Sequence, residues 1–327
     1  MKTLVKLLFF VACFGILAGC QKDEEIYSED AFDKSAKMNK HRAHGLDQYR
    51  CVFMKDYNNL KVNYRIIGKG PVDMVFIPGW SNSLEVYTKQ FDYFRDKARC
   101  IYIDLPGHGQ SDAPTPNNPL DPDSEGLAYT QELMIDAIKT VVKKEGLKKF
   151  IGVGFSWSGA ILKRFEMKYP GMIKQLICLD ISIPTWPPVN EAICEQEYIV
   201  QSSKTYEERL AGLPGLIPLE TAPEGLWEFG LQCLEHSSEI MANAIYHWLG
   251  EENCQPYPWD IPILVVYNEM EDALENLTRS HYPGCEIVVL EGDWHVWPYQ
   301  HVIQWAYQDA VNQLMDDFME DRPGKKY

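Results

Sequence analysis

A serine surrounded by small residues lies where a short apolar run gives way to a helical pattern. The residues are Gly152-Val-Gly-Phe-Ser-Trp-Ser-Gly159, with Ser156 at their centre. A G-x-S-x-G sequence between a strand and a helix forms a sharp turn that lifts the serine Oγ off the sheet. Here Ser158 replaces the second glycine, and Gly159 follows it. The pattern predicts that Ser156 is a nucleophile, and a glycine-rich turn without a catalytic role is the alternative.

The chain around this turn alternates between short apolar runs and helical patterns. A hairpin is predicted first, and buried strands separated by helices follow, which indicates a mostly parallel sheet. The predicted fold class is α/β, with an eight-stranded, mostly parallel sheet, helices on both faces and an inserted helical cap. Strands are expected over residues 50–54, 60–67, 72–77, 100–104, 150–153, 176–180, 263–267 and 287–290. Helices are expected over residues 84–94, 130–144, 160–169 and 302–319.

One stretch, residues 184–259, departs from this alternation. It contains helical patterns without a convincing strand, it is rich in tryptophan, and proline clusters stand at both of its ends. We expect it to form the helical cap over the carboxyl edge of the sheet. The hydrolase core would then consist of residues 49–183 and 260–321, preceded by a flexible tether over residues 20–48.

Four motifs, in the same order and at the same spacing, resemble those of the α/β-hydrolase family. They are Phe76-Ile-Pro-Gly-Trp80, Asp104-Leu-Pro-Gly-His-Gly-Gln-Ser-Asp112, the serine turn around Ser156, and Gly292-Asp-Trp-His295. The first resembles the family's oxyanion loop, the second its D-x-P-G-x-G-x-S structural turn, and the last its histidine loop. The resemblance covers about residues 50–320.

The resemblance implies a role for each matching residue. Ser156 would be the nucleophile and His295 the base that activates it, while the backbone N–H groups of Trp80 and Trp157 would form the oxyanion hole. His108 would be structural, as its turn is in the family. His301 follows His295 by six residues, and we expect it to face solvent.

The acid that would complete the triad has more than one candidate. Asp180 ends the predicted strand at residues 176–180, a position where some members of the superfamily carry their acid. Glu271 stands near the family's usual acid position, with Asp272 beside it. However, Asn268 and Glu271 also have the spacing of a capping box at a helix start. Asp180 is therefore the preferred acid, ahead of Glu271 and then Asp272.

The family and its motifs imply an enzyme that hydrolyses a carboxylic ester or a related acyl bond. The aromatic, apolar composition of the predicted cap favours a small hydrophobic substrate. A serine nucleophile argues against the epoxide hydrolases and haloalkane dehalogenases of this family, which use aspartate. The alternatives are a peptidase similar to proline iminopeptidases, an enzyme similar to cofactor-free quinolone dioxygenases, and a lipoprotein that binds a ligand on a hydrolase scaffold. No cofactor and no metal site are expected.

The N-terminus resembles a bacterial lipoprotein signal. Two lysines precede an apolar run that ends in Leu17-Ala18-Gly19-Cys20. The run is too short to span a membrane as a helix but suits a signal peptide over residues 1–19. Lipidation of Cys20 would anchor the protein to a membrane of the cell envelope, either in the periplasm or at the surface.

Composition sets the remaining limits. The chain has 327 residues, of which 46% are hydrophobic and 24% are charged, as in a folded protein. Its formal charge of -16 disfavours nucleic acid as a partner, because phosphate backbones are also negative. Cys100, Cys178 and Cys285 lie in or beside apolar runs, so we expect them to be buried thiols. A disulfide in the cap would draw on Cys194, Cys233 and Cys254.

Overall fold

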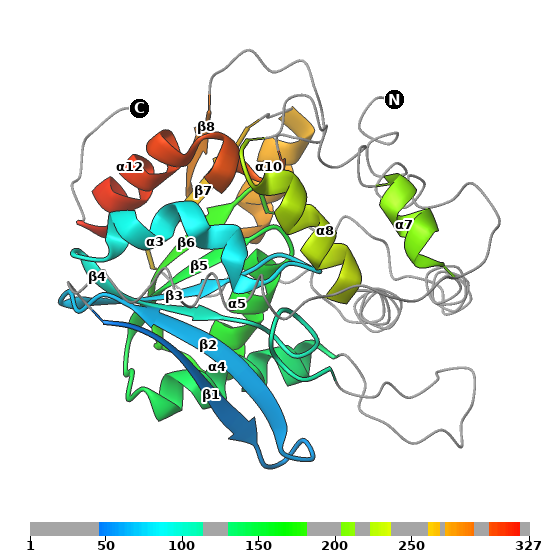
Figure 1. Cartoon of the computed structure of the whole chain (residues 1–327). Coiled ribbons are helices and arrows are strands. Elements are labelled where there is room, and N and C mark those ends of the chain that lie inside the picture. The colour runs from blue at the N-terminus through cyan, green and yellow to red at the C-terminus, as the bar shows by residue number, and fades with distance from the viewer. Residues whose placement is uncertain are drawn as a thin grey trace.

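The structure is a computed structural model that describes residues 46–113, 130–181, 204–212, 223–236, 261–268, 272–290 and 301–320 (Figure 1). The predicted signal peptide, Cys20 and nearly all of the tether lie outside the described residues, as does most of the predicted cap. In the described part of the chain, no helix is long and apolar enough to cross a membrane.

Eight strands form one sheet in the order β1-β2-β4-β3-β5-β6-β7-β8. β1 and β2 pair antiparallel, as do β2 and β4, and every other neighbouring pair is parallel. This is the mostly parallel α/β sheet with an antiparallel start that the sequence predicts. The strands are β1 (Asp47–Met54), β2 (Leu60–Ile67), β3 (Val72–Ile77), β4 (Ala98–Ile103), β5 (Phe150–Phe155), β6 (Ile173–Leu179), β7 (Ile263–Tyr267) and β8 (Glu286–Val289).

Helices cover both faces of the sheet, each over its own apolar core (Figure 1). α4 (Gln131–Lys144), α5 (Ser158–Lys168) and α10 (Asp272–His281) pack on one face. The other face carries the 3-10 turn η2 (Leu84–Tyr87), α3 (Thr88–Phe94), α8 (Leu226–His236), α11 (Ile303–Ala306) and α12 (Gln308–Met319). α7 (Tyr206–Gly212) lies next to α8 in the predicted cap.

The central strands are apolar along their whole length because both of their faces are covered. All six residues of β5 and all five residues of β7 are buried. Such strands lack the alternation of polar and apolar residues that marks a half-exposed strand. The bounds of β3 and β7 agree with the predicted ranges, residues 72–77 and 263–267.

The last predicted helix, over residues 302–319, is two helices in the structure. It breaks at Tyr307, whose backbone leaves the helical region at φ −126° and ψ 39°. The Tyr307 N–H still donates to Ile303 O, at 2.8 Å, and its carbonyl accepts from Val311 N at 2.9 Å. Because of this break, α11 and α12 are two separate helices and do not form one continuous helix.

The cysteines in apolar runs are buried thiols, as predicted. Cys100, Cys178 and Cys285 are all buried and free. Cys233, on α8, is a free thiol as well, so it forms no disulfide here. Cys194 and Cys254 lie outside the described residues.

Candidate active site

Ser156 occupies the sharp turn between β5 and α5. Its backbone has φ +54°, a left-handed conformation that is rare for residues other than glycine and that occurs often at functional sites. Its N–H donates to Leu179 O, at 2.9 Å, and only 5% of the residue is exposed. The turn therefore fixes the serine at the carboxyl edge of the sheet, at the end of a buried strand.

Ser158, which replaces the second glycine of the pattern, forms hydrogen bonds beneath the turn. Its Oγ accepts a hydrogen bond from Phe155 N, at 2.8 Å, and lies 2.7 Å from Ile77 O, to which it donates. One buried hydroxyl thus connects the ends of β3 and β5 directly beneath the turn. Ser158 therefore stabilises the position of Ser156 and has no proposed role in the chemical reaction.

Two glycines let the neighbouring backbones approach the turn closely. A Cβ added to Gly154 would lie 2.9 Å from Gly159 N, which is closer than real contacts allow. A Cβ added to Gly79 would lie 2.9 Å from a ring carbon of Phe155 and 3.2 Å from the Cβ of Ser156. The Gly79-Trp80 segment therefore lies directly beside the serine.

A histidine and an aspartate extend from Ser156 in one chain of hydrogen bonds. His301 Nε2 lies 2.9 Å from Ser156 Oγ, and His301 Nδ1 lies 2.6 Å from Asp180 Oδ2. A carboxylate only accepts, so Nδ1 carries the ring proton and Nε2 is left to accept the serine proton. This is the arrangement of a nucleophile, a base and an orienting acid.

The sheet register places Asp180 next to Ser156. Phe155 at the end of β5 pairs with Leu179 at the end of β6, so the two residues that follow them are neighbours at the same edge. Asp180 has φ +42°, and its N–H donates to Val266 O at 2.7 Å. The preferred acid is thus the one that meets the histidine. Glu271 lies outside the described residues, and Asp272 is exposed at the start of α10.

The histidine of this constellation differs from the expected one. His295 lies outside the described residues, and the histidine beside Ser156 is His301. The expectation that His301 faces solvent is wrong. His301 lies two residues before α11, and α11 is held against η2 because the Trp305 Nε1–H donates to Val86 O at 2.7 Å. No local sequence signal identifies His301, because tertiary contacts of α11 set the direction of this segment.

The two residues predicted to supply the oxyanion donors, Trp80 and Trp157, lie close to each other beside Ser156. Trp157 is the N-cap residue of α5. The first N–H groups that donate to preceding backbone carbonyls at the start of this helix are those of Gly159 and Ala160. The N–H of a residue at this position is not used by the helix, and it lies at the helix's positive end. The rings of Trp80 and Trp157 are 6.2 Å apart. Their backbone N–H groups remain the predicted donors to an oxyanion.

The aspartate of the second motif has a structural part. The buried Asp104 carboxylate accepts from Leu84 N at 2.7 Å, Gln110 N at 3.0 Å and Asn63 Nδ2 at 2.8 Å. Burial raises the pKa of this carboxyl to about 6, although the three hydrogen bonds oppose that shift. Asp104 therefore connects η2, β2 and the turn that follows β4.

α8, in the predicted cap, packs against the segment that carries the histidine. The Phe229 ring stacks on that of Trp305 with centroids 5.7 Å apart, and Asn82 Nδ2 lies 4.0 Å from Cys233 Sγ. These contacts hold α8 against α11 and the loop that follows β3.

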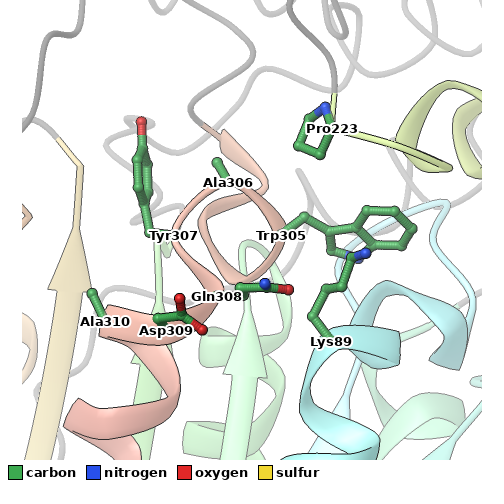
Figure 2. Close-up of a pocket in the computed structure, with 8 residues that line it drawn as sticks. All are labelled: Lys89, Pro223, Trp305, Ala306, Tyr307, Gln308, Asp309 and Ala310. Atoms are coloured by element: carbon green, nitrogen blue, oxygen red, sulfur yellow. The ribbon is translucent and has the colours of Figure 1, made fainter.

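A hollow beside Trp305 has none of the three triad residues in its lining. Its volume is about 540 Å³. Figure 2 shows the Lys89 side chain beneath the Trp305 indole, and both residues line the hollow. The Lys89 Nζ lies 5.0 Å from that ring centroid. Its lining residues come from α3, α11, α12 and the segment before α8, and Ser156, His301 and Asp180 are not among them.

Comparisons with known proteins identify the fold of the chain. A family profile described as "alpha/beta hydrolase fold" matches residues 74–234, which include the serine turn. The chain has the α/β-hydrolase fold. A hydrolase from Pseudomonas aeruginosa PA01 superposes with a TM-score of 0.67 and 17% identity, over 83% of this chain and 98% of that one. A thermophilic esterase from Thermogutta terrifontis gives 0.65 and 18%, over 84% and 98%.

Among curated relatives of this α/β-hydrolase-fold chain is epoxide hydrolase 3 of Mus musculus. It is 23% identical over 79% of this chain and 72% of its own length. Epoxide hydrolase 3 of Xenopus tropicalis is 24% identical, over 71% of this chain and 57% of its own length. The names of these two relatives point to a reaction other than ester hydrolysis.

Within the described residues, no group of three or more histidine, cysteine, aspartate or glutamate side chains is arranged to hold a metal ion. The hydrogen bonds that connect Ser156, His301 and Asp180 suit nucleophilic and acid–base chemistry.

Proposed function

We propose that this protein is a serine hydrolase that cleaves a carboxylic ester, or a related acyl bond, through an acyl-enzyme. The observation that carries the proposal is the unbroken chain of hydrogen bonds from Ser156 Oγ through His301 to Asp180. A serine hydroxyl is activated when a base accepts its proton, and a carboxylate orients that base. In this proposal Ser156 is the nucleophile, His301 is the base and Asp180 is the orienting carboxylate.

The reaction follows from these positions. Ser156 Oγ attacks the carbonyl carbon while His301 Nε2 accepts its proton, and the N–H groups of Trp157 and Trp80 stabilise the negative carbonyl oxygen. His301 then donates that proton to the departing alcohol as the carbon–oxygen bond breaks. Water, deprotonated by His301, attacks the acyl-enzyme and releases the acid, and His301 returns the proton to Ser156.

The nucleophile distinguishes ester hydrolysis from the epoxide hydrolysis that the curated relatives' names describe. Attack of a serine oxygen on an epoxide carbon would form an ether, which the same base and water cannot hydrolyse. Attack on an acyl group forms an ester, which they can. Ser156 thus supports turnover of acyl substrates, and a panel of p-nitrophenyl esters of increasing acyl length tests this directly.

Replacing Asp180 by asparagine is expected to lower kcat by about 10³–10⁴-fold. An asparagine amide N–H in the place of Asp180 Oδ2 would donate to His301 Nδ1. The ring proton of His301 would then lie on Nε2, so Nε2 could not accept the serine proton. The measurement is steady-state hydrolysis of p-nitrophenyl butyrate. Asp272→Asn, an exposed change at the start of α10, and Glu271→Gln are the controls, and a larger loss in Glu271→Gln would assign the acid to Glu271 instead.

We also propose that the protein is anchored to the cell envelope through a lipid on Cys20. The support is the sequence pattern alone: a charged start, a short apolar run and Leu17-Ala18-Gly19-Cys20. Cys20→Ser is expected to abolish incorporation of a clickable palmitate analogue in a bacterial host and to move the protein from the membrane fraction. Equal labelling of the Cys20→Ser variant and the unaltered chain would exclude this anchor.

A further inference from the structure

The segment that carries His301 depends on tertiary contacts for its position. The helix that follows the histidine, α11, is a single turn, and it ends at Tyr307, where the backbone leaves the helical region. A single helical turn has too few internal hydrogen bonds to be stable alone. The His301 side chain is itself 28% exposed, so packing around the ring fixes it only in part. The distance from His301 Nε2 to Ser156 Oγ therefore depends on what holds α11.

Trp305 connects α11 to the 3-10 turn η2. Its indole N–H donates to Val86 O at 2.7 Å, and only 7% of the residue is exposed. The Phe229 ring stacks on the indole with centroids 5.7 Å apart, and Lys89 Nζ lies 5.0 Å from the indole centroid. The N–H is the only polar group of the indole, so this one directional bond sets how α11 meets η2.

The same 3-10 turn is bonded to the support of the serine turn. Tyr87 OH donates to Ile77 O at 2.7 Å, and Ile77 O also accepts from Ser158 Oγ at 2.7 Å. Val86 and Tyr87 are neighbours in η2. A series of buried hydrogen bonds therefore leads from Trp305, in the helix after the base, to the turn that carries the nucleophile.

We propose that Trp305 is a positioning residue for His301. Its bond to Val86 O fixes the histidine segment relative to the serine turn, so that His301 Nε2 stays at hydrogen-bond distance from Ser156 Oγ. A displacement of about 1 Å near reacting groups can lower a rate by about 10²-fold. Loss of this bond is therefore expected to slow the chemical step more than it weakens substrate binding. The inference rests on the proposed function, because it names a residue on which the proposed base depends.

The first test is Trp305→Phe, which removes the indole N–H but keeps an aromatic ring beside Phe229. We expect kcat for p-nitrophenyl butyrate to fall by about 10–100-fold while KM stays within about 3-fold. The same fall is expected with p-nitrophenyl acetate, because the change acts on the base and not on the acyl group. A folded variant whose kcat falls by less than about 5-fold would overturn the proposal.

A double variant separates positioning of the base from general damage to the fold. Where His301→Gln is already present, adding Trp305→Phe is expected to change the residual rate by less than about 2-fold, because no base remains to be displaced. A further loss as large as the one in Trp305→Phe alone would show that Trp305 acts on the fold or on the serine turn. That result would contradict the proposal.

A second single variant acts on the same indole from the cap helix. Phe229→Leu removes the ring that stacks on Trp305 but leaves the indole N–H in place. We expect a smaller fall in kcat, about 3–10-fold, with KM again nearly unchanged. If Trp305→Phe shows no native melting transition, this variant decides, and an unchanged kcat in it would overturn the proposal.

Tyr64→Phe is the matched control. Tyr64 is a fully buried ring on β2, in the other apolar core, and its hydroxyl donates to Glu145 Oε1 at 2.6 Å. The control therefore also removes one hydrogen bond from a buried ring, and kcat is expected to stay within about 2-fold even where the melting temperature falls. A fall in kcat in Tyr64→Phe as large as that in Trp305→Phe would contradict a specific role for Trp305.

Fluorophosphonate labelling distinguishes failure of this inference from failure of the proposed function. Labelling of Ser156 that is as fast in Trp305→Phe as in the unaltered chain would reject only the inference. An unaltered chain that folds but acquires no label on Ser156 would reject both.

Discussion

Replacing Ser156 by alanine is expected to lower kcat for p-nitrophenyl butyrate by about 10⁴–10⁶-fold while leaving the fold intact. The loss is large because no other group in the site can form the acyl-enzyme. The fold is expected to persist because alanine keeps the Cβ that serine already carries at φ +54°, so the turn acquires no new strain. The measurement is initial rates at saturating ester, together with thermal melting.

Ser280→Ala is the matched control for this change. Ser280 is exposed on α10, so its removal is expected to leave kcat within about 2-fold of the unaltered enzyme. Ester hydrolysis at an undiminished rate in Ser156→Ala would mean that Ser156 is not the nucleophile, and would contradict the proposed mechanism.

The second large effect is expected at His301. His301→Gln should lower kcat by about 10³–10⁵-fold, because glutamine cannot take the Ser156 proton and then return it to the leaving alcohol. His295→Gln should retain most of the activity, since it is His301 whose Nε2 lies 2.9 Å from Ser156 Oγ. Pre-steady-state kinetics of both variants separate a slow acylation step from weak substrate binding.

The pair of variants decides between the two histidines. A large loss in His295→Gln, with activity retained in His301→Gln, would mean that His295 is the base. Equal, small losses of activity in both variants would mean that neither histidine acts as the general base.

The strands and the serine turn could be predicted because local sequence determines them. Residues 72–77 and 263–267 are short apolar runs, the first ending before Pro78-Gly79 and the second beginning after Pro262, and β3 and β7 have these bounds. The glycines around Ser156 are needed because neighbouring backbones approach within contact distance. Asp180 was the preferred acid because it ends a strand, and the register of β6 on β5 places it beside Ser156.

The histidine could not be predicted in the same way. The choice between His295 and His301 depends on the path of the chain from β8 to α11, which the local sequence pattern does not determine. The direction of the final segment is set instead by tertiary contacts, above all Trp305 with Val86 and Phe229. A motif match located the loop but not the residue that reaches the serine.

The central claim is that Ser156 is an activated nucleophile. Treating the purified chain with a fluorophosphonate probe and mapping the adduct by peptide mass spectrometry tests this claim most directly. We expect one adduct, on Ser156, that forms much more slowly in His301→Gln and Asp180→Asn. A chain that shows a native melting transition but acquires no adduct on Ser156 would contradict the account.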